Sequence, residues 1–174
     1  MNTQEEFLTK ICSFYISDWH LVTMLLPYIN KKLNEGVKIA TVLEKDIREN
    51  VKTLLERLNL KVENESRILD INWNKISTNK NFNIKNLFSN INNEVIIIVN
   101  GKREFIENAN NNLIKYIESN SIKQNIKIIN CYEIVEFDGS ITDILDRHDK
   151  ILNTSGEKEI YEVFEDYERK KKIG

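Results

Sequence analysis

Four side chains in this 174-residue chain could hold a soft metal ion or take part in thiol chemistry. They are Cys12, Cys131, His20 and His148, and thiolate and imidazole are the groups that bind zinc, copper and haem iron. No CxxC or HExxH spacing accompanies them. Because free cysteine is most often a small core residue, we expect no cofactor. Cys12, Cys131 and His148 remain the metal or haem candidates of an alternative interpretation.

Phosphate chemistry is a second possibility, and the sequence argues against it. Residues 11–29 (ICSFYISDWHLVTMLLPYI) pass from an apolar strand through a polar turn into an apolar helix. Nucleotide-binding proteins place a glycine-rich loop at such a junction, because glycine lets backbone N–H groups wrap a phosphate. The turn here is SDWH, without glycine, and Gly101-Lys102 lacks the rest of a phosphate loop. With no nucleophile motif either, we expect a protein that is not an enzyme.

Candidate ligand contacts follow the predicted strands at the points where they end. Ligands of open α/β sheets bind beyond the carboxyl ends of the strands. Period-two alternation would place Cys12 and Phe14 on one face of the sheet and Ser13 and Tyr15 on the other. Trp19 and Trp73 could form an apolar pocket floor. The candidate set is Phe14, Tyr15, Trp19, His20, Glu44, Cys131, Tyr132 and Glu133. Polar residues also gather at strand ends simply because turns need them.

Alternating strands and helices must position these residues. Apolar patterning predicts strands at 10–16, 37–43, 68–73, 94–100 and 126–134, with 151–152 as an added edge strand. Helices are predicted from Ser17 or Asp18 to Gly36, with Pro27 inside, and at 45–58, 103–119 and 141–150, while 82–91 could form a short helix. This order indicates an α/β fold with a mostly parallel sheet and helices on both faces.

Composition indicates one globular domain, which we place at residues 1–155, followed by a charged helical tail at 156–174. Hydrophobic residues make up 41% and charged residues 30%, as in ordinary globular proteins. The net charge of −2 provides no basic field for nucleic acid. The longest apolar run, 95–99, is too short to span a bilayer. We therefore expect no nucleic-acid or membrane partner and a cytoplasmic location.

Several short motifs resemble the MEDS domain, a sensory domain of methanogens and methylotrophs. Residues 11–15 (ICSFY) are similar to its HIC-x-FY strand, and residues 26–29 (LPYI) to its VPFL helix. The segment from Cys131-Tyr132-Glu133 through Phe137 to residues 143–148 (DILDRH) is similar to its C-x-YD…F…DALRTHP segment. The resemblance covers residues 8–155. The chain departs from the family pattern at Lys10, Glu133 and Asp149, where the family has histidine, aspartate and proline.

The resemblance implies a RecA/KaiC-like three-layer sandwich that lacks a phosphate loop. It also implies a non-catalytic, cytoplasmic sensing module that binds a small organic molecule and controls a signalling protein, such as a histidine kinase or a transcription regulator. A homodimer is one way to transmit the state. Two alternatives remain open: a protein-interaction regulator without a ligand, such as a kinase antagonist that acts through the tail, and a metal, haem or thiol redox sensor.

Overall fold

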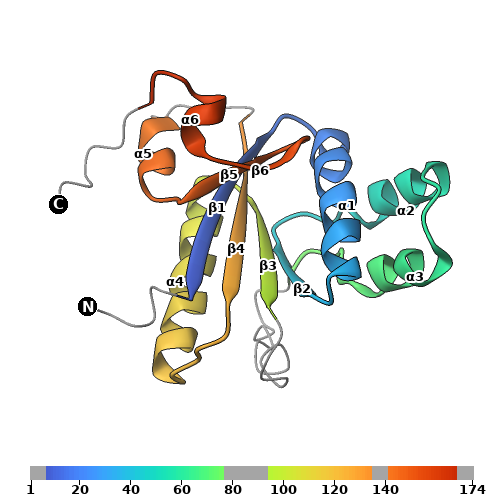
Figure 1. The fold of residues 1–174 in the computed structure, drawn as a ribbon, viewed down its shortest axis with the longest axis horizontal. Helices are drawn as coiled ribbons and strands as arrows, with labels where there is room; N and C mark the ends of the chain where they lie inside the picture. Colours follow the sequence, from blue (N-terminus) through green and yellow to red (C-terminus); the bar gives the residue numbers. More distant parts are fainter. Residues whose placement is uncertain (1–6, 77–93, 135–140, 168–174) are drawn as a thin grey trace.

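One mixed sheet organises the computed structural model, which describes residues 7–76, 94–134 and 141–167 (Figure 1). Its strands lie in the order β2-β3-β4-β1-β5-β6. Strands β1 (Leu8–Tyr15), β2 (Lys38–Leu43), β3 (Val95–Gly101), β4 (Ile126–Glu133) and β5 (Lys150–Asn153) run parallel, and β6 (Gly156–Lys158) pairs antiparallel with β5. The predicted α/β class with a mostly parallel sheet is confirmed.

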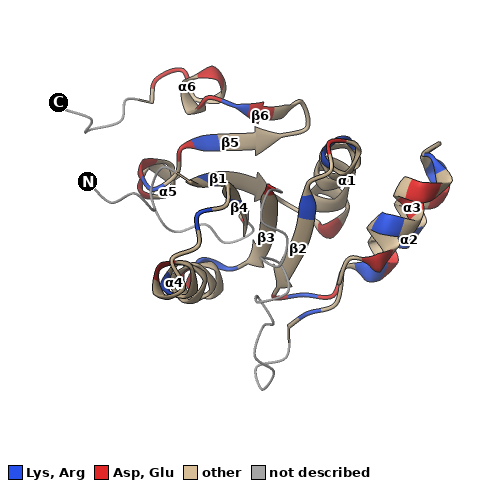
Figure 2. Cartoon of the chain, turned by 60° about the horizontal axis from the view of Figure 1, so that its bottom comes forward, with Lys and Arg blue, Asp and Glu red and all other residues tan. Residues whose placement is uncertain are grey.

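Helices cover both faces of the sheet and make a three-layer arrangement (Figure 1). The first hydrophobic cluster joins the sheet to α1 (Asp18–Asn34), α2 (Arg48–Arg57) and α3 (Val62–Asp70). The second cluster lies on the other face, under α4 (Arg103–Ser119), α5 (Ile141–Asp146) and α6 (Ile160–Val163). Lysine, arginine and acidic residues are interspersed on the helices, while the described strands carry few charges (Figure 2).

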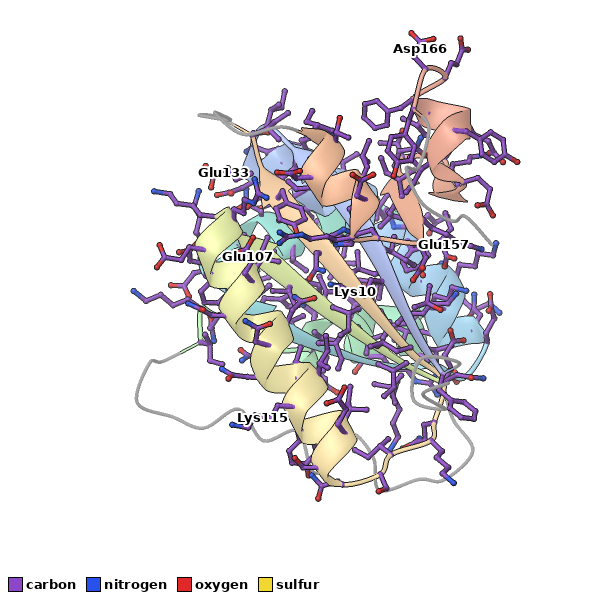
Figure 3. All side chains as sticks on the ribbon, turned by 90° about the vertical axis from the view of Figure 1, so that its left-hand side faces the viewer. Lys10, Glu107, Lys115, Glu133, Glu157 and Asp166 are labelled. Carbon is purple, nitrogen blue, oxygen red and sulfur yellow. The ribbon has the colours of Figure 1, made fainter. Side chains whose placement is uncertain are left out.

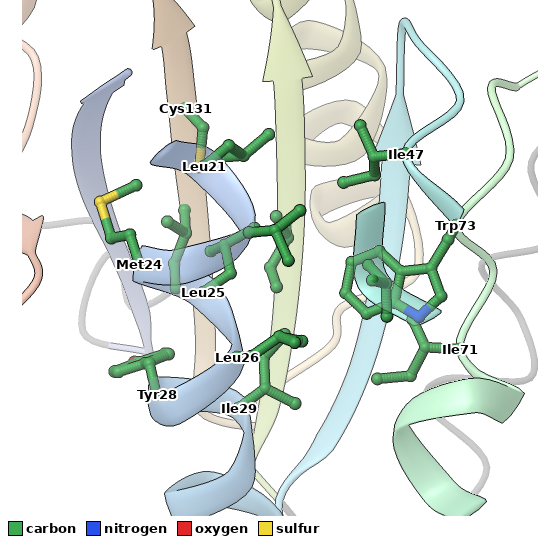
Figure 4. Close-up of a cluster of buried hydrophobic side chains, with 14 of the residues drawn as sticks. Leu21, Met24, Leu25, Leu26, Tyr28, Ile29, Ile47, Ile71, Trp73 and Cys131 are labelled. Atoms are coloured by element: carbon green, nitrogen blue, oxygen red, sulfur yellow. The ribbon is translucent and has the colours of Figure 1, made fainter. Parts of the chain in front are cut away.

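Helix α1 begins and ends as its sequence predicts. The Ser17 hydroxyl accepts a hydrogen bond from the His20 backbone N–H at 3.1 Å, which caps the first turn. Pro27 lies inside the helix, and Gly36 follows its end with a φ of +80°. A broad apolar stripe, which includes Leu21, Leu25 and Ile29, packs against the sheet (Figure 4).

The structure corrects three element assignments. Residues 68–73 are not a strand: α3 ends at Asp70, and the chain then loops so that the Trp73 indole N–H donates to the Ile68 carbonyl at 2.7 Å. The helix predicted at 141–150 ends at Asp146. Residues 151–152 belong to an interior strand, because β6 pairs outside β5. The helix suggested at 82–91 and Phe137 lie outside the described residues.

The expected boundary after residue 155 falls inside the β5–β6 hairpin. Leu152 and Glu157 are register partners across it. The first residues of the predicted tail therefore belong to the sheet, and the described helix in the tail is only Ile160–Val163. No helix in the described ranges combines the length and the apolar character needed to cross a bilayer.

Glu157 fastens the hairpin to the rest of the fold. Its carboxylate accepts a hydrogen bond from the Tyr28 hydroxyl at 2.5 Å and lies 3.0 Å from Lys127 Nζ. Lys127 also lies 3.4 Å from Glu94. Burial alone would raise the pKa of Glu157, but the hydrogen bonds from Tyr28 and Lys127 lower it below its ordinary value of 4.5.

We expect a Glu157→Gln substitution to lower the free energy of unfolding by about 1–2 kcal/mol at pH 7, since hydrogen bonds to charged groups contribute on this scale. Because the folded-state pKa is depressed, this contribution is present above pH 4.5 and is lost as the pH falls through the lower folded value. Urea titrations at several pH values measure it, with exposed Glu162 changed to Gln as the control. A difference that persisted in acid would contradict the assignment.

Candidate functional site

The next described helices after β1 and β4 lie on opposite faces of the sheet. Strand β1 leads into α1 on the first-cluster face, whereas α5, the next described helix after β4, packs in the second cluster. The two strands are neighbours, and Tyr15 is the register partner of Glu133. Neighbouring strands whose following helices lie on opposite faces form a topological switch point, and ligands of open α/β sheets bind there. We call the carboxyl ends of β1, β3 and β4, on the face covered by α1, the carboxyl-edge site.

Three polar side chains meet at the carboxyl-edge site. Tyr15 is the last residue of β1, Asn100 is the residue before the last in β3, and Glu133, labelled in Figure 3, is the last residue of β4. Tyr15 and Asn100 are fully buried. Strand alternation places all three on the α1 side, because Ile98 and Cys131, two residues before Asn100 and Glu133, belong to the first cluster with Tyr15.

Three buried polar atoms at this site have no hydrogen-bond partner within the described part of the chain. They are the Tyr15 hydroxyl oxygen, Asn100 Nδ2 and Glu133 Oε2, and of these three only Glu133 Oε2 has an ion-pair partner, Lys45 Nζ at 2.6 Å. In this structure Asn100 Oδ1 accepts a hydrogen bond at 3.0 Å from the Glu44 backbone N–H, which also donates to the Asn100 backbone carbonyl at 3.2 Å. Asn100 Nδ2 is therefore the open donor of the amide. Folded proteins pair nearly all buried polar groups, so the two that remain open beside the topological switch point make this edge a candidate functional site.

Charge at the site is negative around the phenol. Burial raises the pKa of Tyr15 most, and the carboxylates of Glu133 and Asp18 raise it further, while a hydrogen-bonding contribution from the Asn100 side chain partly offsets the rise. The phenol is therefore neutral at physiological pH and can both donate and accept. Lys45 Nζ lies 2.6 Å from Glu133 Oε2 and forms an ion pair that joins the segment after β2 to the end of β4.

Glu44, one of the predicted ligand contacts, is used by the fold itself. Its Oε1 accepts a hydrogen bond at 2.7 Å from the backbone N–H of Lys102, the residue that precedes α4. A carboxylate at a helix N-terminus satisfies an open N–H group and complements the helix dipole. Glu44 therefore holds β2 to the β3–α4 turn, and we assign it a structural role.

The sheet separates the remaining predicted contacts. Tyr15, Cys131 and Glu133 lie on the α1 side, and Cys131 points toward Leu21 (Figure 4). Phe14 and Tyr132 lie on the opposite side, with ring centroids 5.9 Å apart, so they cannot contact the same ligand as Tyr15 at this site.

The two predicted contacts in the β1–α1 turn stay at the rim. His20 Nδ1 accepts from the Ile16 backbone N–H at 3.1 Å and closes the turn, while Trp19 is 48% exposed. Trp73 is a core residue with no exposed surface, so it does not floor a pocket with Trp19. Asn100 is a residue that the sequence places at a strand end on the same rim, and it belongs to the site although it is not one of the predicted ligand contacts.

The metal candidates do not come together. Cys12 belongs to the second cluster and Cys131 to the first, so the sheet lies between their side chains. Burial and the neighbouring Cys12 raise the pKa of Cys131, which keeps its thiol protonated. His148 engages both ring nitrogens, Nδ1 with the Ile144 carbonyl at 2.6 Å and Nε2 with Asn130 Nδ2 at 3.0 Å. No group of three metal-binding side chains occurs in the described ranges.

The open phenol gives a test that uses two tyrosines of the same cluster. Tyr15→Phe removes a hydroxyl without a partner, so the free energy of unfolding should stay the same or rise by up to about 1 kcal/mol. Tyr28→Phe removes a hydroxyl bonded to Glu157 and should lower it by about 1–2 kcal/mol. Urea denaturation of both variants measures the contrast. Equal destabilisation would show that Tyr15 has a partner of its own.

Comparison with known proteins gives no functional assignment. The chain matches no protein-family model, no curated protein and no solved structure. Its function is therefore inferred from its own residues and their geometry.

Proposed function

We propose that this chain is a non-catalytic sensing module that binds a small organic molecule at the carboxyl-edge site and regulates a partner signalling protein. The observation that carries the proposal is the pair of buried polar atoms without partners, Tyr15 Oη at the end of β1 and Asn100 Nδ2 at the end of β3. Each such group costs about 1–3 kcal/mol of stability when left unpaired. Sequences retain costs of this kind mainly where function requires them.

The arrangement suits binding better than catalysis. General acid–base catalysis needs a titratable group held within hydrogen-bond reach of a reacting atom. At this site the phenol is held neutral and the Glu133 carboxylate is paired with Lys45, while the His20 imidazole stays at the rim and accepts from the backbone. The groups at the site can therefore orient a ligand by hydrogen bonding.

We further propose membership of the MEDS family, with a RecA/KaiC-like fold. Two of the three motif segments that carry the resemblance include neighbouring strands, with Ser13 opposite Cys131 and Tyr15 opposite Glu133. Two departures from the family pattern also meet: the Lys10 backbone N–H donates to the Asp149 carboxylate at 2.9 Å. A ligand would control a histidine kinase or transcription regulator, or a homodimer, by binding one of two conformations more tightly.

Native mass spectrometry of the protein purified from cells tests the proposal. We expect a bound small molecule in the wild type and in Tyr161→Phe, a control that removes an exposed hydroxyl on α6. The Tyr15→Phe variant should have lost it. A bound molecule that remains in Tyr15→Phe at the wild-type level, or its absence from the wild type, would overturn the proposal.

A ligand-free interaction regulator is the second candidate, and exposed apolar side chains on α6 favour it. Tyr161 is 62% exposed and Val163 is 38% exposed. Deleting residues 157–174 would remove most of β6 and Glu157, so substitution is the better test. Under this hypothesis, changing Tyr161 and Val163 to Ser should abolish capture of a partner while leaving the unfolding midpoint unchanged. Capture at the wild-type level would exclude it.

A further inference from the structure

We propose that the ligand presents an uncharged oxygen, as a hydroxyl or a carbonyl group, to Tyr15 and Asn100, and that the carboxyl-edge site rejects anions and ammonium groups of the same size. The inference rests on the proposed function and names the chemical class of its ligand. It stands on the orientation of two buried side chains and on the charges around them.

Asn100 defines the first requirement, a hydrogen-bond acceptor on the ligand. Its amide cannot turn over without breaking the 3.0 Å hydrogen bond from the Glu44 N–H to Oδ1. The open atom is thus Nδ2, a donor. An ammonium group has no lone pair to accept from it, so an amine ligand would leave the Asn100 donor unpaired and pay its desolvation cost.

Tyr15 adds a second donor beside the first. Its hydroxyl has no partner of normal hydrogen-bond geometry; burial raises its pKa, and a hydrogen-bonding contribution from the Asn100 side chain offsets the rise only in part. A neutral phenol donates one hydrogen bond, and an sp² or hydroxyl oxygen has two lone pairs. One ligand oxygen placed between the two side chains can therefore satisfy both. Binding of this kind removes two unpaired groups at once, which favours the complex over the empty site.

The surrounding charges exclude an anion. Glu133 on β4 and Asp18 on α1 both raise the pKa of Tyr15, so negative charge at the phenol oxygen is unfavourable. The same field acts against a carboxylate or phosphate at that point. Lys45 does not compensate, because its ammonium group is already held 2.6 Å from Glu133. An uncharged ligand oxygen avoids the repulsion that an anion meets and also accepts the hydrogen bond that an ammonium group cannot accept.

The Lys45–Glu133 ion pair also lies at this edge of the sheet. It joins the segment after β2 to the end of β4, across the end of β3 that carries Asn100. The Lys45 side chain is 40% exposed and Glu133 is 16% exposed, so lysine is the partner that can swing into solvent. A ligand hydroxyl can in addition donate to the Glu133 carboxylate, which a carbonyl cannot do.

Four probes of matched size test the class: butan-1-ol, butyramide, butyrate and butylammonium. The readout is the ¹⁵N NMR signal of the Asn100 side-chain amide in the full chain. We expect butan-1-ol and butyramide to shift this signal in a saturable way and the two charged probes not to. Tyr15→Phe should weaken the binding of both neutral probes about fivefold or more, the scale of one hydrogen bond. Tyr161→Phe should bind like the wild type.

Asn100→Asp provides a second variant, because it keeps the acceptor for the Glu44 N–H and removes the donor. Its binding of butan-1-ol, followed by ligand-observed NMR, should fall about fivefold or more. Saturable binding of butyrate or butylammonium at Asn100 would overturn the uncharged class and leave the proposed function standing. The same holds if no probe binds while native mass spectrometry shows a Tyr15-dependent molecule. If neither method detects binding, both proposals fail.

Discussion

Replacing Trp73 with alanine is expected to lower the free energy of unfolding by about 3–5 kcal/mol, the range for truncation of a large buried aromatic side chain. Trp73 has no exposed surface and packs in the first hydrophobic cluster with Ile47 and Ile71 (Figure 4). The alanine variant would lose these contacts and leave a cavity that the neighbouring helix and strand can only partly fill. It would also leave the Ile68 carbonyl without the indole N–H at 2.7 Å.

Trp73 also fixes the path of the chain between α3 and the sheet. Its backbone carbonyl accepts from the Ile47 N–H at 2.9 Å, at the N-terminus of α2. Urea denaturation followed by far-ultraviolet circular dichroism measures the loss of stability. Trp19→Ala is the matched control, because Trp19 is 48% exposed and its removal should change stability by less than about 0.5 kcal/mol. Similar losses in the two variants would contradict the core assignment of Trp73.

The contrast between the two tryptophans shows where sequence reasoning succeeds and where it fails. Strong helical or apolar periodicity predicted α4 at its observed bounds, Arg103–Ser119, and predicted β3 and α1 closely. The short run at 68–73 carries apolar residues at spacings that fit a strand or a helix end equally well. Tertiary contacts determine the structure of this run, because the Trp73 indole N–H turns back to donate to the carbonyl of Ile68.

The sequence predicted where the candidate site lies but only some of the residues that form it. The rule that ligands meet the carboxyl ends of parallel strands pointed to Tyr15 and Glu133, which are register partners. It could not separate Phe14 and Tyr132 from them, because strand ends converge on one edge while their side chains alternate between two faces. The same rule could not show that the Glu44 carboxylate accepts a hydrogen bond from the Lys102 N–H, because the two residues are far apart in sequence.

The contact between Glu44 and the Lys102 N–H is also the reason that a Gly101→Ala substitution should lower the free energy of unfolding strongly. Gly101 has a φ of +145°, which side chains rarely adopt. A Cβ atom there would lie 2.4 Å from Glu44 Oε1 and 2.8 Å from Glu44 Cβ. Glu44 cannot move aside freely, because Oε1 holds the Lys102 N–H at 2.7 Å and its backbone N–H binds Asn100. We expect a loss of about 3 kcal/mol from backbone strain and overpacking together.

The same substitution should disturb the carboxyl-edge site, because the strained residue directly follows Asn100. Gly36→Ala isolates this effect: Gly36 also has a positive φ, +80°, but no heavy atom lies within 4 Å of a Cβ added there. It should cost about 1–2 kcal/mol, the penalty for a left-handed backbone alone. Urea denaturation gives both losses, and the Asn100 side-chain amide signal should move in Gly101→Ala but not in Gly36→Ala. Equal losses with an unmoved Asn100 signal would show that Glu44 does not hold the end of β3 in place. The open donor of Asn100 would then owe its orientation to something other than the Glu44 contact.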